Sequence, residues 1–446
     1  MIKITMLMLL AVTHVFANLD HAPKNFKIES KKFVFVDFVK ADYFLTFDVA
    51  SEKATYKAVI TFNQPVAGSP VFDIIEMPST SKVNGKNDKA IQISSPGDET
   101  KYVSLSSTLD SGFHTFEFTG NIKTNTDFTS DSARSGFWMS DLTDRRYLEQ
   151  YLPTNLEFDQ FAMSMDVKVT GTQTPHRIFT NGTLSEKSSN HFHIAYPDYF
   201  SSSSVYFHLS EKGRFKIKSF SHKSIDGREI PIVTYSKSSW SLYEIEKNTL
   251  KVMKELESKF GPWGHPSLTA YIAGMGGMEH SGATITSRSA LGHELTHSYF
   301  ARGVLPTNGN SGWLDEAVAS WRDKGYKASS SPGYSSTNLA AFSNYKRTTT
   351  TKAYTEGAAF MAYINLKLNG NLEGFLKKMY EDYLHGQWTT EIFLKELNDF
   401  SGMDFSNSFN KYVYGSNEKK EHNKHNARKG SPMHPKLTKQ QLLDLL

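Results

Sequence analysis

The spacing of hydrophobic and polar residues changes once along this chain and so divides it into two parts. Up to about residue 235, short runs alternate apolar with polar positions; examples are residues 32–36, 55–62 and 162–169. A period of two places the apolar side chains on one face of a strand. Turn residues separate these runs. The pattern predicts an all-β domain of sandwich or saddle type over residues 18–235.

Two places in this region carry the signal of a tight β-hairpin. Lys212-Gly213 and Asp226-Gly227 each stand between two runs of strand-forming residues. Glycine after a polar residue suits the backbone of a two-residue hairpin turn. The region has no repeat of fixed period. A propeller or a solenoid is therefore not expected.

After residue 235 the apolar residues follow the period of a helix. They recur at Leu242, Ile245, Thr249, Met253, Leu256 and Phe260. Ser241 and Glu244 resemble a capping box that begins this helix, and Gly261-Pro262 ends it. A strand over residues 268–273 and several helices follow. The pattern predicts a second, mostly helical domain over residues 236–415.

Both ends of the chain differ in composition from these domains. Residues 1–17 combine Lys3, an apolar stretch and a small-residue cleavage site that ends at Ala17. This is typical of a secretory signal peptide, so we expect a secreted or periplasmic protein, with an ordinary first strand as the alternative. Residues 416–446 are basic and largely polar. We expect a flexible tail there, with a leucine-rich end that can dock.

Length, charge and cysteine usage exclude several classes of protein. A chain of 446 residues exceeds one hydrophobic core, which favours two or three domains. The net charge of +4 is too small to indicate a nucleic-acid partner. The absence of cysteine excludes disulfides and thiolate zinc sites. No apolar stretch after the N-terminus is long enough to be a transmembrane segment, and nothing in the pattern signals oligomerisation.

The clearest chemical signal lies in residues 293–297, which read His-Glu-Leu-Thr-His. On a helix, His293 and His297 share one face and can bind one ion. Glu294 then lies beside that ion, where its carboxylate can accept a proton from water. Glu316, nineteen positions after His297, is the candidate third ligand. We expect one Zn²⁺ per chain, because three nitrogen and oxygen ligands leave a position open for catalysis. A solvated helix face that carries two histidines is the alternative.

Other residues can complete such a site. Tyr354 is a candidate donor to the oxyanion of a peptide-hydrolysis transition state, although a buried core tyrosine explains it too. Asp323 lies seven residues after Glu316 on the same helix face and can orient a histidine ligand, or is an ordinary exposed acid. Gly276 and Gly277 permit close approach of a substrate backbone. Glu279 can bind an α-amino group, and a plain glycine-rich turn is the alternative.

These residues resemble a known group of peptidases. His293-Glu294-x-x-His297 with eighteen residues before Glu316 is the spacing of the gluzincins, specifically of the aminopeptidase N and leukotriene-hydrolase family. Residues 313–317, Trp-Leu-Asp-Glu-Ala, are similar to that family's Trp-Leu-Asn-Glu-Gly, and residues 354–358 resemble its Tyr-x-Lys-Gly-Ala. The resemblance implies an N-terminal saddle domain and a thermolysin-like catalytic domain. It also implies that Tyr354 stabilises the oxyanion.

The chain departs from this family in three ways. Residues 276–280 read Gly-Gly-Met-Glu-His, where the family has Gly-Ala-Met-Glu-Asn, and so are also similar to the Gly-Gly-Leu-Glu-His of glycyl aminopeptidases. The spacer from Glu279 to His293 is shorter than in either group. No helical-repeat domain is expected after residue 415.

The residues and the resemblance together predict an exported zinc metallopeptidase that hydrolyses peptide or protein substrates. In the first place we expect an aminopeptidase, with Glu294 as the general base and with Glu279 at the amino terminus of the substrate. An endopeptidase on the same scaffold is the first alternative. A non-catalytic binding protein that contains zinc is the second.

Overall fold

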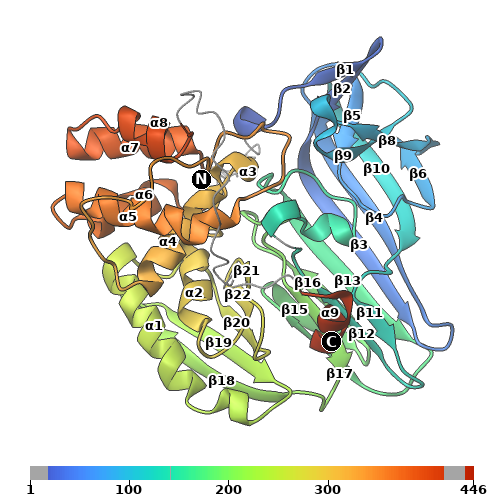
Figure 1. The fold of residues 1–446 in the computed structure, drawn as a ribbon. Coiled ribbons are helices and arrows are strands. Elements are labelled where there is room, and N and C mark those ends of the chain that lie inside the picture. The colour runs from blue at the N-terminus through green and yellow to red at the C-terminus, as the bar shows by residue number, and fades with distance from the viewer. Residues whose placement is uncertain (1–18, 141, 416–436) are drawn as a thin grey trace, which may run out of the picture.

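A computed structural model describes residues 19–140, 142–415 and 437–446 (Figure 1). The predicted signal peptide, residues 1–17, lies outside the described residues, as do residues 416–436 of the tail predicted over residues 416–446. Within the described ranges, no helix has the length and apolar character needed to cross a bilayer.

A large sheet with long central strands forms the main part of the N-terminal half. In spatial order its strands are β15 (Thr183–Ser188), β16 (His191–Ala195), β13 (Ala162–Thr170), β3 (Asp37–Asp48), β4 (Lys53–Gln64), β10 (Gly112–Asn121), β6 (Thr80–Val83) and β7 (Lys86–Asn87). Burial alternates along β4, as the period of two requires. The rings of Phe62 and Phe116 stack in its core with centroids 4.0 Å apart. The strands predicted at residues 55–62 and 162–169 are confirmed as β4 and β13.

Two smaller sheets complete this half. One contains β1 (Phe26–Ile28), β2 (Lys31–Phe35), β5 (Ser69–Phe72), β9 (Lys101–Leu105) and β8 (Ala90–Ser94); the other contains β11 (Thr126–Phe128), β12 (Ala133–Phe137), β17 (Phe207–Glu211) and β14 (His176–Thr180). The strand predicted at residues 32–36 is confirmed as β2. The hairpin predicted at Lys212-Gly213 is wrong, because β17 pairs with β12 and β14 and not with the strand that follows. A turn signal marks a change of direction but does not determine which strand becomes the partner.

A fourth sheet leads into the helical part. Its order is β18 (Lys216–Lys223), β19 (Glu229–Ser236), β20 (Leu268–Ile272), β22 (Ala283–Thr286) and β21 (Met278–His280). The hairpin predicted at Asp226-Gly227 is confirmed, since Lys223 pairs with Glu229 across it. β19 pairs in parallel with β20, so the predicted boundary between residues 235 and 236 falls inside this sheet.

Helices dominate the rest of the described chain. They are α1 (Ile245–Phe260), α2 (Leu291–Phe300), α3 (Asn308–Ser311), α4 (Trp313–Asp323), α5 (Glu356–Lys367), α6 (Leu372–Tyr383), α7 (Thr390–Ser401), α8 (Ser406–Tyr412) and α9 (Lys439–Leu445). A short pair, β23 (Leu305–Pro306) with β24 (Gln387–Trp388), joins two of the connections. Figure 1 shows α1 to α8 on one side of the molecule and α9 alone among the strands. The predicted combination of a sheet-rich N-terminal half with a helical region after it is confirmed at this level.

The capping box predicted at the start of α1 is wrong. Glu244 has φ 52°, in the left-handed region, and its side chain makes no capping hydrogen bond. A residue other than glycine rarely adopts this conformation, and it separates a short 3₁₀ turn at Trp240–Leu242 from α1. The helix therefore begins at Ile245.

Two neighbouring helices, α2 and α4, position the chemistry. Every residue of α2 is buried, and its apolar members Leu295 and Phe300 belong to the same core as Trp313 and Val318 of α4. Burial of the polar residues on α2 is costly unless each finds a partner. The polar face of α2 therefore has to meet compensating groups on α4 and on the adjoining loops.

Candidate metal centre

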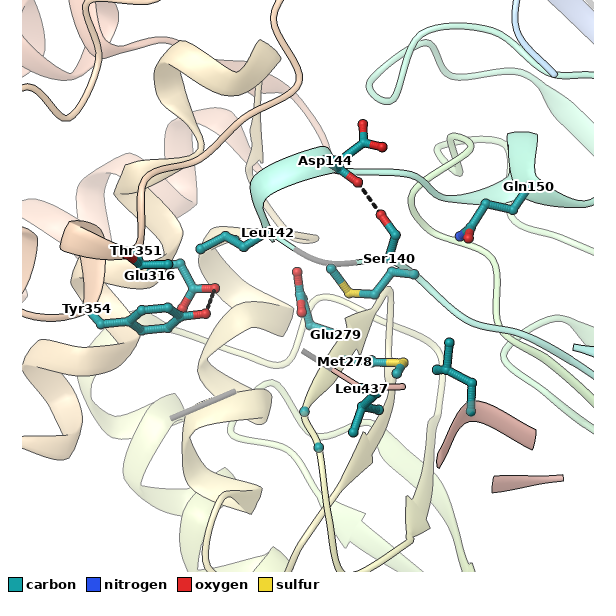
Figure 2. A pocket seen from close by; sticks show the side chains of 14 residues that line it. Ser140, Leu142, Asp144, Gln150, Met278, Glu279, Glu316, Thr351, Tyr354 and Leu437 are labelled. Atoms are coloured by element: carbon teal, nitrogen blue, oxygen red, sulfur yellow. Dashed lines mark hydrogen bonds between the residues drawn. The ribbon is translucent and has the colours of Figure 1, made fainter. Parts of the chain in front are cut away.

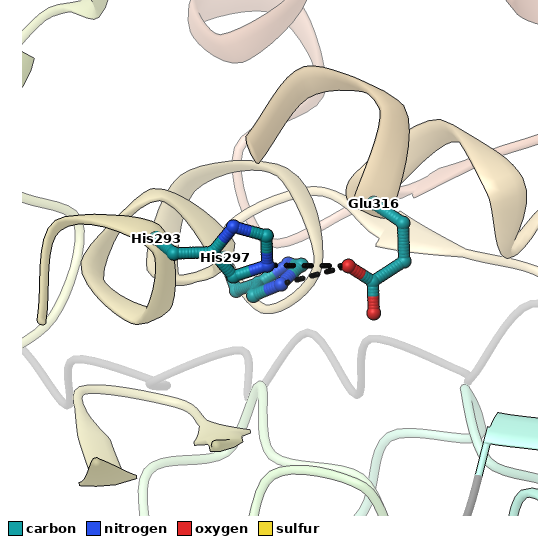
Figure 3. Close-up of side chains that lie close together, drawn as sticks. All are labelled: His293, His297 and Glu316. Atoms are coloured by element: carbon teal, nitrogen blue, oxygen red, sulfur yellow. Dashed lines mark hydrogen bonds and ion pairs between the residues drawn. The ribbon is translucent and has the colours of Figure 1, made fainter. Parts of the chain in front are cut away.

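Three ligand-type side chains from α2 and α4 converge in the interior. His293 and His297 stand one helical turn apart on α2, and their Nε2 atoms lie 3.3 and 3.4 Å from Oε2 of Glu316 on α4 (Figure 3). All three residues are buried, and the three ligand atoms lie within 4.8 Å of one another. The helical spacing of the two histidines is what brings both rings to one carboxylate.

This geometry fits a zinc ion. Zinc binds imidazole nitrogen and carboxylate oxygen at about 2.0–2.2 Å, and two ligands at that distance from a tetrahedral centre are about 3.4 Å apart. The observed separations of 3.3 and 3.4 Å match this spacing. The donor set also lacks the thiolates that typify structural sites.

The charges of the three residues stabilise one another. Burial disfavours a charged His297, but the carboxylate of Glu316 outweighs it and raises the pKa of His297 to about 9. Burial would raise the pKa of Glu316, yet the neighbouring imidazoles, His297 first, hold that pKa well below its usual range. The carboxylate is therefore ionised, which is the form that binds a metal.

Asp323, at the end of α4, contacts the outer edge of His293. Its Oδ2 lies 2.7 Å from Nδ1 of His293. Arg322 lies 3.1 Å from Oδ1 of Asp323 and also pairs with Glu255 at 2.9 Å. A carboxylate on Nδ1 favours the tautomer in which Nε2 carries the lone pair that a metal needs.

Glu294 lies next to the histidines on α2 and is buried. Its carboxylate groups with Glu279 and His297 in a second cluster of ligand-type atoms. Burial raises the pKa of Glu294 to about 8. A carboxyl group with a pKa near neutrality suits proton transfer.

Tyr354 approaches Glu316 from a short helix, Thr351–Tyr354, that precedes α5. Its hydroxyl donates a hydrogen bond of 2.8 Å to Oε1 of Glu316 (Figure 2). Burial, and then the charge of Glu316, raise the pKa of Tyr354 well above its ordinary value. The phenol therefore stays protonated and remains a hydrogen-bond donor.

Glu279 lies on the edge strand β21 and faces a cavity that Glu316 and Tyr354 also line. Arg302 donates to Oε1 of Glu279 at 2.9 Å and to its backbone oxygen at 3.1 Å. Burial would raise the pKa of Glu279, but the positive charges around it, Arg302 first and then His297, together lower that pKa, so the carboxylate is ionised. The cavity has a volume of about 250 Å³, and Gly276, Gly277, Glu316 and Tyr354 line it with Glu279. The structure thus brings all the predicted site residues to one region, with Asp323 behind His293.

Comparison with solved structures identifies the architecture. No family profile matches the sequence, and no curated protein matches it. An aminopeptidase A of Legionella pneumophila, solved with aspartic acid, superposes with a TM-score of 0.65 at 13 % identity over 88 % of this chain. A variant of an M1 zinc metallopeptidase of Deinococcus radiodurans superposes with a TM-score of 0.63 at 14 % identity over 86 % of this chain. This is the fold of the M1 zinc metallopeptidases.

These two solved structures differ in how much of their own length matches. This chain spans 51 % of the Legionella protein and 96 % of the Deinococcus protein. The Deinococcus protein has also been solved with a Tyr-Ser-Ala substrate, at the same 14 % identity.

Within the M1 fold, two buried arginines near the site were not recognised from the sequence. The guanidinium groups of Arg145 and Arg302 lie over the ring of Tyr147, 5.9 and 5.1 Å from its centroid. Arg145 also lies 3.8 Å from Asp315, the residue before Glu316. Arg302 follows His297 by five positions, so its place just after α2 was a usable signal. Arg145 lies in the N-terminal half, and no spacing links it to the metal ligands.

Proposed function

We propose that this chain is a zinc-dependent peptidase that removes residues from the amino terminus of peptides. The observation that carries the proposal is the convergence of His293 and His297 on Glu316, at 3.3 and 3.4 Å, beside a cavity that Glu316 lines together with Glu279. One residue of a metal-type ligand set and a carboxylate for an amino group therefore face the same small cavity. We also propose that residues 18–235 form a saddle domain and that residues 236–415 form a thermolysin-like catalytic domain, with one zinc ion per chain.

Each residue has a role in this proposal. Zinc held by His293, His297 and Glu316 would supply Lewis-acid polarisation of the scissile carbonyl. Glu294 accepts a proton from the attacking water at its carboxylate and returns it to the departing amine. Tyr354 donates its hydroxyl proton in a hydrogen bond to the oxygen of the former carbonyl as negative charge develops there. Asp323 keeps His293 in the orientation and tautomer that the site requires.

Glu279 is the proposed contact for the substrate's α-amino group. Its ionised carboxylate lines the cavity, and Arg302 holds it from the side of the protein. Gly276 and Gly277 precede it and leave room for the substrate backbone. A buried carboxylate that receives an ammonium group gains a charge-assisted hydrogen bond, which a blocked amino terminus cannot supply.

The proposal includes export and a peptide substrate. Support for export is the signal-like composition of residues 1–17, with cleavage after Ala17. Support for a peptide substrate is the fold that this chain shares with the Deinococcus protein solved with Tyr-Ser-Ala.

A paired peptide assay tests the proposal. The purified chain is stripped with a chelator, reloaded with one equivalent of zinc, and given a tripeptide with either a free or an acetylated amino terminus. We expect hydrolysis only after reloading, and only of the free peptide. Equal rates on the two peptides would indicate an endopeptidase, and zinc binding without hydrolysis of either would indicate a binding protein.

A further inference from the structure

The last described residues of the chain, 437–446, return to the candidate active site. They form α9, which a capping box begins: Thr438 Oγ1 accepts from the backbone nitrogen of Gln441 at 3.2 Å, and Gln441 Oε1 accepts from that of Thr438 at 2.9 Å. Such reciprocal capping satisfies backbone donors that a short helix otherwise leaves exposed. In Figure 1, α9 lies among the strands, apart from the other helices.

Apolar contacts and two hydrogen bonds hold this segment in place. Leu445 and Leu446 are buried, with exposed fractions of 2 % and 1 %, in a cluster that includes aromatic residues of β19 and β20. Arg214 donates to the backbone oxygen of Leu446 at 2.6 Å, and Lys237 donates to that of Asp444 at 2.5 Å. Arg214 precedes β18 and Lys237 follows β19, and these two strand ends pair with each other, so α9 is attached to the open end of that hairpin.

Two leucines of this segment line the cavity that contains the candidate site. Leu437 and Leu442 face it together with Met139 and Met278. The approach is close, because a Cβ atom added to Gly276 would lie 3.3 Å from Cδ1 of Leu437. In Figure 2, Glu279 is seen between the Tyr354–Glu316 pair on one side and Met278 with Leu437 on the other. The cavity therefore has a polar, metal-ligand end and an apolar end that the last segment helps to build.

We propose that residues 437–446 form the wall that selects the substrate's amino-terminal residue, with Leu437 and Leu442 contacting its side chain and favouring an apolar one. This rests on the proposed function, in which Glu279 binds the α-amino group of that same residue. The amino group and the side chain of that residue are attached to the same α-carbon. When Glu279 binds the amino group, the side chain therefore lies close to the methionine and leucine side chains that line the cavity. The segment is a wall and not a plug, because a cavity of about 250 Å³ remains beside it.

The size of the cavity agrees with this role. Its volume lies below the roughly 300–1,000 Å³ of pockets for drug-sized ligands, so it suits one or two residues of a peptide. One methylene more or less in an apolar pocket changes selectivity about 10-fold to 200-fold. Two leucine side chains in the wall of the cavity are therefore enough to determine which amino-terminal residue of a substrate is bound.

Leucine-to-alanine variants test the wall. Leu437→Ala combined with Leu442→Ala enlarges the apolar end, and Leu443→Ala is the matched control because Leu443 packs on the same cluster without lining the cavity. Tripeptides X-Ala-Ala, with X as Leu, Met, Ala or Asp, are compared by kcat/KM. We expect the native chain to prefer Leu and Met at least 10-fold over Ala and Asp, the double variant to lose at least 10-fold of that preference, and the control to keep it. An unchanged preference in the double variant, or an equal rise for all four peptides, overturns the proposal.

A binding measurement separates this inference from the proposed function. The zinc-loaded Glu294→Gln protein, with native or doubly substituted leucines, is titrated with L-leucine and with L-alanine by calorimetry. We expect leucine to bind at least 10-fold more tightly than alanine, and the double substitution to remove most of that difference. If the native protein cleaves no peptide but leucine still binds more tightly than alanine, the proposed function fails and the proposed role of the wall stands. If the two amino acids bind equally to the native wall, the wall is overturned whatever the activity.

Discussion

The Nδ1 atom of His293 lies 2.7 Å from the Oδ2 atom of Asp323. This contact joins the first histidine of α2 to the last residue of α4, the two helices that supply the candidate ligands. Asp323 holds the Nδ1 atom of His293, and the Nε2 atom of the same ring is directed at Glu316.

Loss of this contact should weaken metal binding. We expect Asp323→Asn to lower the affinity for zinc about 10-fold to 100-fold, because an amide holds the imidazole less strongly in the required tautomer. Competition with a chromophoric chelator measures the affinity. Asp382→Asn, an exposed acid on α6, is the control. An unchanged affinity in Asp323→Asn would show that the contact does not support the metal.

Removal of the Tyr354 hydroxyl should slow catalysis and leave zinc in place. The hydroxyl is a protonated donor 2.8 Å from Glu316 in the wall of the cavity. We expect Tyr354→Phe to reduce kcat about 100-fold to 1,000-fold with little change in KM, because the hydrogen bond strengthens in the transition state. Zinc content and the kinetics of one free tripeptide check this. Tyr363→Phe on α5 is the control, and a change in KM alone would assign Tyr354 to substrate binding.

Neutralising Glu279 should act on the amino terminus of the substrate. Glu279→Gln keeps an oxygen that can accept from Arg302 but removes the charge that would bind an ammonium group. We expect KM for free tripeptides to rise 10-fold or more, in line with the loss of a charge-assisted hydrogen bond. Peptides of increasing length with a free amino terminus provide the measurement. The same KM in the native protein and in the variant would remove Glu279 from substrate recognition.

A buried acid pair in the β domain should make stability depend on pH. Asp37 and Asp159 are both buried, and burial raises the pKa of Asp37 to about 6. The folded state then binds this proton more tightly than the unfolded state, so the pair costs stability as pH rises from about 4 to about 6. We expect Asp37→Asn to be more stable than the native chain by roughly 2 kcal/mol above pH 6, and by much less at pH 4. Urea unfolding at both values tests this, and a difference that does not vary with pH would contradict it.

Much of the fold could be predicted because periodicity is a local property. The alternation in β4 and the helical spacing in α1 follow from which face each residue buries. Strand partners could not be predicted in the same way. The turn at Lys212-Gly213 joins two different sheets, since β17 finds its partners 27 or more positions back in the chain; Phe207 pairs with Thr180 of β14 and with Phe137 of β12.

The candidate site, too, contains residues that local sequence patterns could place and residues that they could not. His293 and His297 could be placed from sequence because one helix sets their geometry. Arg302 pairs with Glu279 across 23 positions, and Leu437 reaches Gly276 from the far end of the chain. Contacts of this kind depend on tertiary packing, which no local pattern encodes.

In the proposed mechanism, His293, His297 and Glu316 hold a catalytic zinc ion and Glu294 moves the proton. The most direct measurement is zinc content together with hydrolysis of a free tripeptide, in the native chain and in Glu294→Gln. We expect one zinc ion per chain in both proteins, with hydrolysis only in the native one. Retained hydrolysis by the Glu294→Gln protein with zinc bound would contradict it.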